Sequence, residues 1–350
     1  MNDFDNRMRL KEKAEEDMYF ARRDRELIQS LHQRDALERV QEEASGKPRQ
    51  GREPVEHFES VRLSHGSLSF SGLALGEGPV VLLLHGFPDN ARSWRYQLPA
   101  LANAGYRAVA VHIRGYEPSS QPADGDYSLE ALASDVPAFL DGLEADTAHL
   151  VGHDWGAAIA YTAAARFPHR LRSLTTLAVP HAGRFLGEAV RYPRQLRLSW
   201  YMLFFQLRGL ADHVLARRNF DFIRMLWRQW SPGWDIPAAE LEHVIDTFHQ
   251  PGVPRAALAY YRSALSPASI PLSAAAREAG RYPVPVPTLA MTGANDRCID
   301  TDIFRRMMYP EDFPAGLEVH QIPAAGHFPH QEQPERVNSL SLDWIERHNS

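Results

Sequence analysis

The chain has 350 residues, of which 44% are hydrophobic and 23% are charged, and it contains a single cysteine. One cysteine cannot form an intrachain disulfide, so a small scaffold built on disulfides is excluded. The formal net charge of -6 provides no positive field for nucleic acid or an anionic membrane. No apolar run approaches the roughly 18–20 residues that cross a bilayer, and the N-terminus lacks the apolar stretch of a signal peptide. We therefore expect a cytoplasmic protein without a nucleic-acid partner or a membrane span.

The N-terminal segment differs in composition from the rest of the chain. Of its first 56 residues, 26 are charged. Apolar residues recur there at helical spacing and form one narrow stripe: Ala14, Met18, Ala21, Ile28 and Leu31. The pattern predicts a charged helical extension with a linker over residues 1–55. Such a helix either lies solvated or provides a contact for a homodimer or another partner.

The body of the chain alternates between strand and helix patterns. Residues 57–64 and 67–75 predict a hairpin around a turn at His65–Gly66. The apolar run at 79–84 predicts a strand covered on both faces, and similar runs follow at 107–115, 147–155, 171–179, 286–293 and 317–323. Helical patterns lie between them, at 128–143 and 157–167. The alternation predicts an α/β fold with a doubly wound, mostly parallel sheet.

About a hundred residues separate two of these strands and show helical periodicity only. The prediction is therefore a core formed by residues 56–179 and 286–350, interrupted by a helical cap at 180–285. No Gly-rich nucleotide-binding motif occurs in the chain, so neither a dinucleotide nor a nucleoside triphosphate is expected as a cofactor.

The sequence Gly152-His153-Asp154-Trp155-Gly156 lies where a buried strand ends and a helix begins. Two glycines around a central polar residue are typical of a sharp strand-to-helix turn that exposes the central side chain at the end of a sheet. The familiar version has serine at the centre, and no G-x-S-x-G occurs in this chain. The plainer interpretation is an Asp that caps a helix. We predict that Asp154 is a nucleophile.

A carboxylate nucleophile implies a particular reaction. With an ordinary pKa of about 3.9, Asp needs no base for activation, and it attacks a saturated carbon that carries a leaving group. The product is an alkyl ester of the enzyme. Its hydrolysis requires a water molecule, a general base and an oxyanion hole.

Two loops after later strands offer the base and its partner. His327 follows the last predicted strand, and Asp296 follows the strand at 286–293. The chain order of nucleophile, acid and histidine fits such a fold. His330 is the competing base, and Asp300 and Asp302 are the competing acids.

The oxyanion hole is predicted from two backbone N–H groups. One belongs to Trp155, directly after the nucleophile, and the other to Phe87 in the His85-Gly86-Phe87-Pro88 loop that follows the strand at 79–84. A mere turn is the plainer interpretation of that loop. Residues of these motifs are also predicted to line the substrate pocket: His85, Pro88, His153, Trp155 and Phe328.

Four segments together resemble one enzyme family: VLLLHGFPDNARSWRYQ, GHDWGAAIA, GANDRC and AAGHFPHQEQPERV. From about Glu59 to the C-terminus the chain is similar to the epoxide hydrolase branch of the α/β-hydrolase family, next to the haloalkane and haloacetate dehalogenases. The resemblance implies an α/β-hydrolase fold with an inserted helical cap. It also implies conversion of a small-molecule epoxide and water to a vicinal diol, through a covalent ester intermediate and without a cofactor or metal.

The resemblance further implies two tyrosines of the cap that hold and protonate the epoxide oxygen. Tyr201 and Tyr261 match them by motif, and Tyr260 is the alternative to Tyr261. A phenol with a pKa of about 10 is acid enough to protonate a departing alkoxide. A dehalogenase is the enzymatic alternative, although Phe87 and Trp155 stand where those relatives place halide donors or an arginine. A non-catalytic ligand-binding or interaction protein on the same fold is the alternative from another class.

Three further features have no catalytic role in this prediction. Arg114 lies in a loop that departs from the family pattern, and we expect it to hold that loop. Between Trp200 and Tyr261, 12 of 62 residues are aromatic, which fits either an apolar pocket or the core of the cap. The single cysteine, Cys298, follows the predicted acid by two residues and is interpreted as a packing residue.

Overall fold

The fold was analysed in a computed structural model, which describes residues 58–266 and 282–349. The predicted charged helix and linker at 1–55 lie outside these residues. No helix in the described part of the chain combines the length and the apolar character needed to cross a membrane.

Eight strands form one sheet, in the order β1-β2-β4-β3-β5-β6-β7-β8. The first two form the predicted hairpin, β2 also pairs antiparallel with β4, and the other pairs are parallel. The prediction of a mostly parallel sheet is confirmed. The strands are β1 (Glu59–His65), β2 (Leu68–Leu75), β3 (Val80–Leu84), β4 (Arg107–Val111), β5 (Ala148–His153), β6 (Leu171–Leu177), β7 (Thr288–Gly293) and β8 (Leu317–Ile322).

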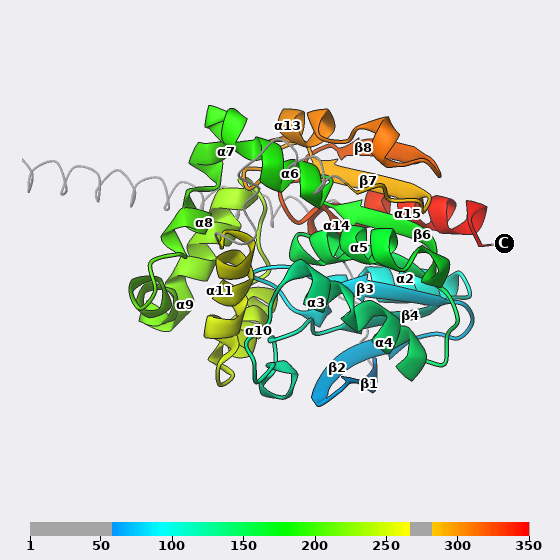
Figure 1. The fold of residues 1–350 in the computed structure, drawn as a ribbon, viewed down its shortest axis with the longest axis horizontal. Coiled ribbons are helices and arrows are strands. Elements are labelled where there is room, and N and C mark those ends of the chain that lie inside the picture. The colour runs from blue at the N-terminus through cyan, green and yellow to red at the C-terminus, as the bar shows by residue number, and fades with distance from the viewer. Residues whose placement is uncertain (1–57, 267–281, 350) are drawn as a thin grey trace, which may run out of the picture. The chain divides into compact units, whose positions relative to one another are not determined.

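Helices cover both faces of this sheet (Figure 1). Those outside the cap are α2 (Gln97–Asn103), α3 (Leu129–Ala133), α4 (Asp135–Gly142), α5 (Trp155–Arg166), α13 (Thr301–Arg306), α14 (Pro329–Glu332) and α15 (Pro334–Arg347). Between β6 and β7, the described part of the predicted cap contains α6 (Ala182–Glu188), α7 (Pro193–Leu198), α8 (Trp200–Phe204), α9 (Leu210–Trp230), α10 (Ala238–His249) and α11 (Val253–Ala264). Residues 217–220 leave the helical conformation, so α9 consists of two helices joined at a kink.

The apolar runs of the central strands supply two hydrophobic cores because successive side chains of a strand point to opposite faces. On β3, Val81 and Leu83 pack with α2 and α15, whereas Leu82 and Leu84 pack with α4, α5 and the cap helices. Helix α5 is rich in alanine and buried over almost its whole length. Its small side chains therefore let it lie close against β5 and β6.

Strand β8 differs from the prediction. Its sequence was interpreted as a strand covered on both faces, but β8 is the edge of the sheet and only Ile322 is buried. Val319 is 37% exposed. An edge strand has a paired neighbour on one side only, and here Val319 is exposed while Glu318 and His320 are partly covered. The prediction of full burial was therefore wrong for this element.

The strand order reverses direction between β3 and β5. From β3 the chain moves outward to β4 on one side and then returns to β5 on the other. Loops leaving the carboxyl ends of such neighbouring strands diverge and open a crevice, which is where open α/β sheets bind their ligands. The loops after β3 and β5 contain Phe87 and Asp154.

Candidate active site

Asp154 occupies the sharp turn between β5 and α5. Its backbone has φ 51° and ψ -118°, a conformation that L-residues rarely adopt. The turn is possible because the glycines on either side approach other backbone atoms closely. A Cβ on Gly152 would collide with the carbonyl oxygen of Gly156, and a Cβ on Gly156 would collide with that of Leu84. The motif therefore forces the Asp154 side chain out of the end of the sheet.

The Asp154 carboxylate is held on one side by a backbone donor. The Phe87 N–H donates to Oδ1 at 2.8 Å, while Oδ2 lies 3.5 Å from Nε2 of His327. Only 5% of Asp154 is exposed. Trp155, the other predicted oxyanion donor, is the first residue of α5, where backbone N–H groups have no partner within the helix. One carboxylate oxygen is thus fixed by a donor, and the other faces the histidine.

His327 lies between two carboxylates and is fully buried. Its Nδ1–H donates to Oδ2 of Asp296 at 3.0 Å, and Nε2 points toward Asp154 without a hydrogen-bond partner among the described residues. Oδ1 of Asp296 accepts the N–H groups of Cys298 and Ile299, which fixes that carboxylate. Asp154, His327 and Asp296, the predicted nucleophile, base and acid, therefore lie within contact of one another.

The competing candidates lie elsewhere. Asp300 caps α13 and pairs with Arg194, and Asp302 is exposed on the first turn of that helix. His330 is fully buried against Trp94, and neither of its ring nitrogens has a partner among the described residues. The geometry favours Asp296 and His327 over these alternatives.

The charge state of His327 is set by opposing effects. Burial on its own lowers the pKa of this imidazole, but the neighbouring Cys298, Asp296 and Asp154 outweigh it and hold the pKa well above the usual 6.5. Loss of the charge on Asp154 would remove one of these stabilising neighbours. The protonation of His327 is therefore coupled to the state of the nucleophile.

Sequence reasoning missed two residues that hold the histidine loop. Ser231, at the C-terminal end of α9, accepts the His327 N–H at 2.9 Å and donates to Glu332 at 2.6 Å. Glu332 also accepts the N–H groups of Gly326 and Phe328. Glu332 lies within the segment AAGHFPHQEQPERV, which carries part of the family resemblance. Nothing in the sequence, by contrast, links Ser231 to residues about a hundred positions away. A residue of the cap thus fixes the backbone of the base.

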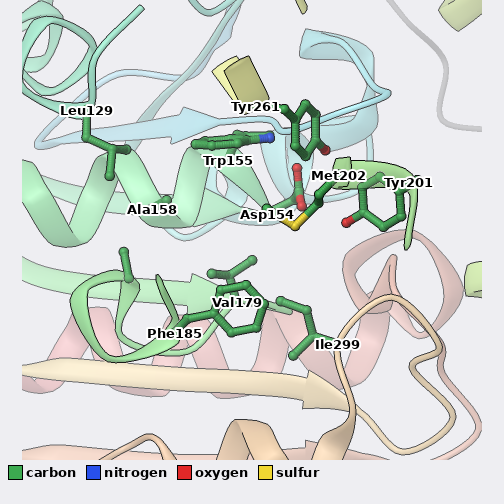
Figure 2. A pocket seen from close by; sticks show the side chains of 11 residues that line it. Leu129, Asp154, Trp155, Ala158, Val179, Phe185, Tyr201, Met202, Tyr261 and Ile299 are labelled. Atoms are coloured by element: carbon green, nitrogen blue, oxygen red, sulfur yellow. The ribbon is translucent and has the colours of Figure 1, made fainter. Parts of the chain in front are cut away.

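The two tyrosines named by motif face Asp154 from α8 and α11, as Figure 2 shows. Their rings meet edge to face, with centroids 5.7 Å apart. The hydroxyl of Tyr261 is buried without a partner in the described structure, and that of Tyr201 lies 3.3 Å from Sγ of Cys298. Tyr260 instead donates to the carbonyl oxygen of Arg114 at 2.5 Å. The geometry therefore favours Tyr261 over Tyr260 as the second acid.

Both phenols are harder to ionise than in water. Burial, followed by nearby negative groups, raises the pKa of Tyr201 and of Tyr261 well above the ordinary 10. A neutral phenol is the form that can donate a hydrogen bond and, later, a proton. An alkoxide is still the stronger base, since an alcohol is as weak an acid as water and much weaker than a phenol.

A narrow cavity with about 50 Å³ of accessible space opens above Asp154. Its wall is apolar apart from Asp154, the two tyrosine hydroxyls and the indole nitrogen of Trp155, so an entering ligand meets polar groups at one end only (Figure 2). The lining residues are Leu129, Asp154, Trp155, Ala158, Val179, Ala182, Phe185, Tyr201, Met202, Tyr261 and Ile299.

Of the five residues predicted to line the pocket, only Trp155 does so in this cavity. The other four are buried and support the site from behind. His85 donates to Gly86 O and accepts the Ile113 N–H, and Pro88 O accepts the indole N–H of Trp227. His153 Nε2–H donates to His327 O at 2.8 Å, and Phe328 stacks against Trp227. The prediction for these four residues does not match the cavity, because a residue next to Phe87, Asp154 or His327 in the sequence need not face the cavity.

The remaining features also have defined places. Arg114 forms a bidentate pair with Asp135 and thereby fastens its loop to α4. Most of the aromatic residues of the cap pack with one another in its core, and of the twelve only Tyr201 and Tyr261 line the cavity. Cys298 is buried as a packing residue would be, but its sulfur also faces the Tyr201 hydroxyl.

Comparison with known proteins agrees with this geometry. The family described as alpha/beta hydrolase fold matches residues 79–334. The chain is 32% identical to Epoxide hydrolase 3 of Xenopus tropicalis over 81% of its own length and 77% of the relative. It is also 32% identical to Epoxide hydrolase 4 of Homo sapiens, over 80% and 76% of the two chains.

Solved structures show the same likeness. An epoxide hydrolase of Bacillus megaterium, crystallised with an inhibitor, superposes with a TM-score of 0.71 at 25% identity, over 82% of this chain and all of the other. An epoxide hydrolase from an endophytic Streptomyces superposes with a TM-score of 0.68 at 29% identity, over 83% and 95%. The buried Asp154, His327 and Asp296 beneath two tyrosines, together with these matches, place the chain in the epoxide hydrolase branch of the α/β-hydrolase family, as a hydrolase.

Proposed function

We propose that the protein converts an epoxide to a vicinal diol through an ester formed on Asp154. The observation that carries the proposal is the arrangement of unsatisfied groups at the end of the cavity. A carboxylate lies there between a buried histidine nitrogen and a buried tyrosine hydroxyl that have no partners among the described residues. Buried polar groups without partners are unusual in proteins, and a ligand oxygen would satisfy them.

In the first step Oδ2 of Asp154 attacks an epoxide carbon, and the carbon–oxygen bond of the ring breaks. Oδ1 stays on the Phe87 N–H. The ring oxygen leaves as an alkoxide, and Tyr201 and Tyr261 stabilise and protonate it. The product of this step is a hydroxyalkyl ester of Asp154.

In the second step water attacks Cγ of Asp154, and His327 Nε2 accepts its proton. The developing oxyanion is Oδ1, which already lies at the Phe87 donor and close to the start of α5. The bond from Cγ to the substrate-bound oxygen then breaks, and the histidinium returns its proton to the diol. Asp154 leaves this step as the carboxylic acid, and its proton restores the tyrosine that protonated the alkoxide, so that the carboxylate and the neutral phenol are both regenerated.

The electrostatics of the site suit this order of events. In the free enzyme the charge on Asp154 is one of the effects that raise the pKa of His327. Ester formation neutralises Asp154, so that His327 releases its proton more readily at the stage when a base is needed. The nucleophile and the base therefore need not compete for the same proton.

The decisive experiment replaces the base. We expect His327→Gln to form the ester with styrene oxide but to hydrolyse it slowly, because Gln cannot accept the proton of water. Mass spectrometry should show one epoxide mass added to the peptide that contains Asp154, and Asp154→Asn should remove this adduct. Diol formation by His327→Gln at the wild-type rate, without an adduct, would contradict the mechanism.

The tyrosines allow a matched series. We expect Tyr201→Phe and Tyr261→Phe each to slow ester formation about 10- to 100-fold, and the double variant to slow it about 10²- to 10⁴-fold, the range typical of general acid catalysis. Tyr260→Phe is the comparison: its hydroxyl contacts the Arg114 carbonyl rather than the cavity, so its loss can only loosen the orientation of Tyr261 and should slow ester formation less than either single variant. Release of halide from a haloalkane, unaffected by removing both hydroxyls, would favour the dehalogenase alternative.

A further inference from the structure

The single cysteine of the chain adds a third metal-binding side chain to the catalytic pair. The sulfur of Cys298, a carboxylate oxygen of Asp154 and a ring nitrogen of His327 all lie within 4.8 Å of one another, and all three residues are buried. Nδ1 of His327 is occupied by Asp296, so the nitrogen available to a ligand is Nε2. From this cluster we propose an inhibitory site for a borderline or soft divalent cation such as Zn²⁺ or Cd²⁺.

The donor set and its spacing fit such an ion. Zn²⁺ takes thiolate, imidazole and carboxylate ligands at about 2.0–2.3 Å in a tetrahedron, which places neighbouring ligand atoms about 3.3–3.8 Å apart. Oδ2 of Asp154 and Nε2 of His327 are already 3.5 Å apart. The fourth position would face the cavity and its tyrosine hydroxyls. Hard cations such as Mg²⁺ lack affinity for sulfur and are not expected to bind.

The surrounding contacts hold two of the three ligands in place. The Cys298 N–H donates to Asp296, which also orients the imidazole of His327 through Nδ1. Such a second contact on a ligating histidine fixes its orientation and increases its basicity. The cation would reach the cluster through the cavity that Asp154 lines, by the route that a substrate takes.

Metal binding would block catalysis rather than assist it. The ion would occupy Oδ2 of Asp154, the attacking atom, and Nε2 of His327, the base. The Cys298 thiol must lose its proton to bind as a thiolate, and Nε2 of His327 must be free of its proton to bind as a neutral imidazole. Both protons pass to the solvent, as is general when metals bind cysteine and histidine. The proposed site therefore makes the enzyme sensitive to thiophilic metals without giving it a metal cofactor.

A second buried cluster provides the control. Asp89, His153 and His330 also bring potential ligand atoms within 4.8 Å of one another. This second cluster lacks sulfur, and both carboxylate oxygens of Asp89 already accept hydrogen bonds. None of its three residues lines the cavity above Asp154. His330→Leu removes a ligand from this cluster and leaves the cysteine cluster intact.

The test is a titration of the reduced, tag-free, full-length protein with Cd²⁺, followed by the ultraviolet sulfur-to-cadmium charge-transfer absorption. Because the chain has one cysteine, this band has a single source. We expect the wild type and His330→Leu to saturate at one equivalent, Cys298→Ser and Cys298→Ala to show no band, and His327→Gln to bind at least about tenfold more weakly. Circular dichroism and thermal melting of each variant establish that it is folded.

A wild-type protein without the band, or equal affinity in His327→Gln, would overturn the proposal. Zn²⁺ inhibition of epoxide hydrolysis provides a second readout, expressed relative to the metal-free rate of each variant. The concentration for half-inhibition should rise at least about tenfold in Cys298→Ala and stay unchanged in His330→Leu. The cadmium titration uses no epoxide, so its outcome is independent of whether the proposed function is correct.

Discussion

Two clusters built from the same residue types lie next to each other in this protein. One contains His327 with Asp296 and Asp154, and the other contains His153 and His330 with Asp89. They are joined by the hydrogen bond from His153 to the His327 carbonyl. All of their imidazoles are fully buried, yet the imidazole pKa values shift in opposite directions in the two clusters.

The difference lies in which atoms the carboxylates contact. His327 has a carboxylate near each ring nitrogen, and its pKa is raised. Burial lowers the pKa of His153 to about 3 and that of His330 well below 6.5, and it raises the pKa of Asp89. Burial therefore lowers the pKa of each imidazole, and it is outweighed only at His327, where Cys298 and two carboxylates adjoin the ring. The following predictions test this contrast, from the largest expected effect to the smallest.

Removing the charge of Asp296 should have the largest effect. Asp296→Asn deprives His327 of the partner that fixes its tautomer and its charge, and we expect diol formation to fall about 10²- to 10⁴-fold in steady-state assays. Asp89→Asn is the matched change in the second cluster, with an expected loss below about tenfold. Equal losses in the two variants would mean that the clusters do not differ in function.

The two clusters should also respond to pH in opposite directions. A raised folded-state pKa makes the contribution of His327 to stability complete below about pH 6.5, and it is lost as the pH rises through the raised value. His153 has a lowered pKa of about 3, so its contribution is complete above about pH 6.5 and falls as the pH drops toward 3. Each contribution changes by at most about 1.4 kcal/mol per pH unit.

The measurement is the free energy of unfolding of the wild type, His327→Gln and His153→Gln across this pH range. The advantage of the wild type over His327→Gln should shrink on the alkaline side, and its advantage over His153→Gln should shrink on the acid side. If both differences in unfolding free energy shrank on the same side of the pH range, the pKa of His327 or of His153 would not shift in the direction given above.

Loss of the loop anchor should have a moderate effect. Ser231→Ala leaves the His327 N–H without its partner and removes one of the hydrogen bonds to Glu332. We expect kcat to fall about tenfold, equivalent to one lost hydrogen bond of about 1.4 kcal/mol. KM should change little because Ser231 does not line the cavity. Ser231→Thr keeps the hydroxyl and should restore most of the rate, whereas a purely steric role would not be rescued.

The smallest effect is expected from His330→Leu. Neither ring nitrogen of His330 has a partner in the described part of the chain, so an apolar side chain of similar size leaves no lost hydrogen bond behind. We expect kcat within about threefold of the wild type and a change in unfolding free energy below about 1 kcal/mol. A large loss of stability would reveal a hydrogen bond that the imidazole makes through water.

The sequence predicts those parts of the site that local geometry determines. Asp154 and Phe87 follow from turns that leave adjacent strands, and His327 and Asp296 from loops at the same edge of the sheet. Tertiary packing decides the rest. Ser231 and the Cys298 sulfur reach the site through contacts between segments far apart in the chain, and the cavity wall includes Leu129 and Phe185, whose surroundings carry no motif.

The hydrogen bond of Tyr260 has a consequence for redesign of the enzyme. Adjacent residues of an α-helix project about 100° apart, so the anchor at Tyr260 also sets the direction of the Tyr261 hydroxyl. The hydrogen bond to the Arg114 carbonyl thus fixes the rotation of helix α11 about its own axis. If the cap were replaced by that of a relative, the tyrosine equivalent to Tyr261 would keep its orientation only if the loop of Arg114 presented its carbonyl oxygen at the same place.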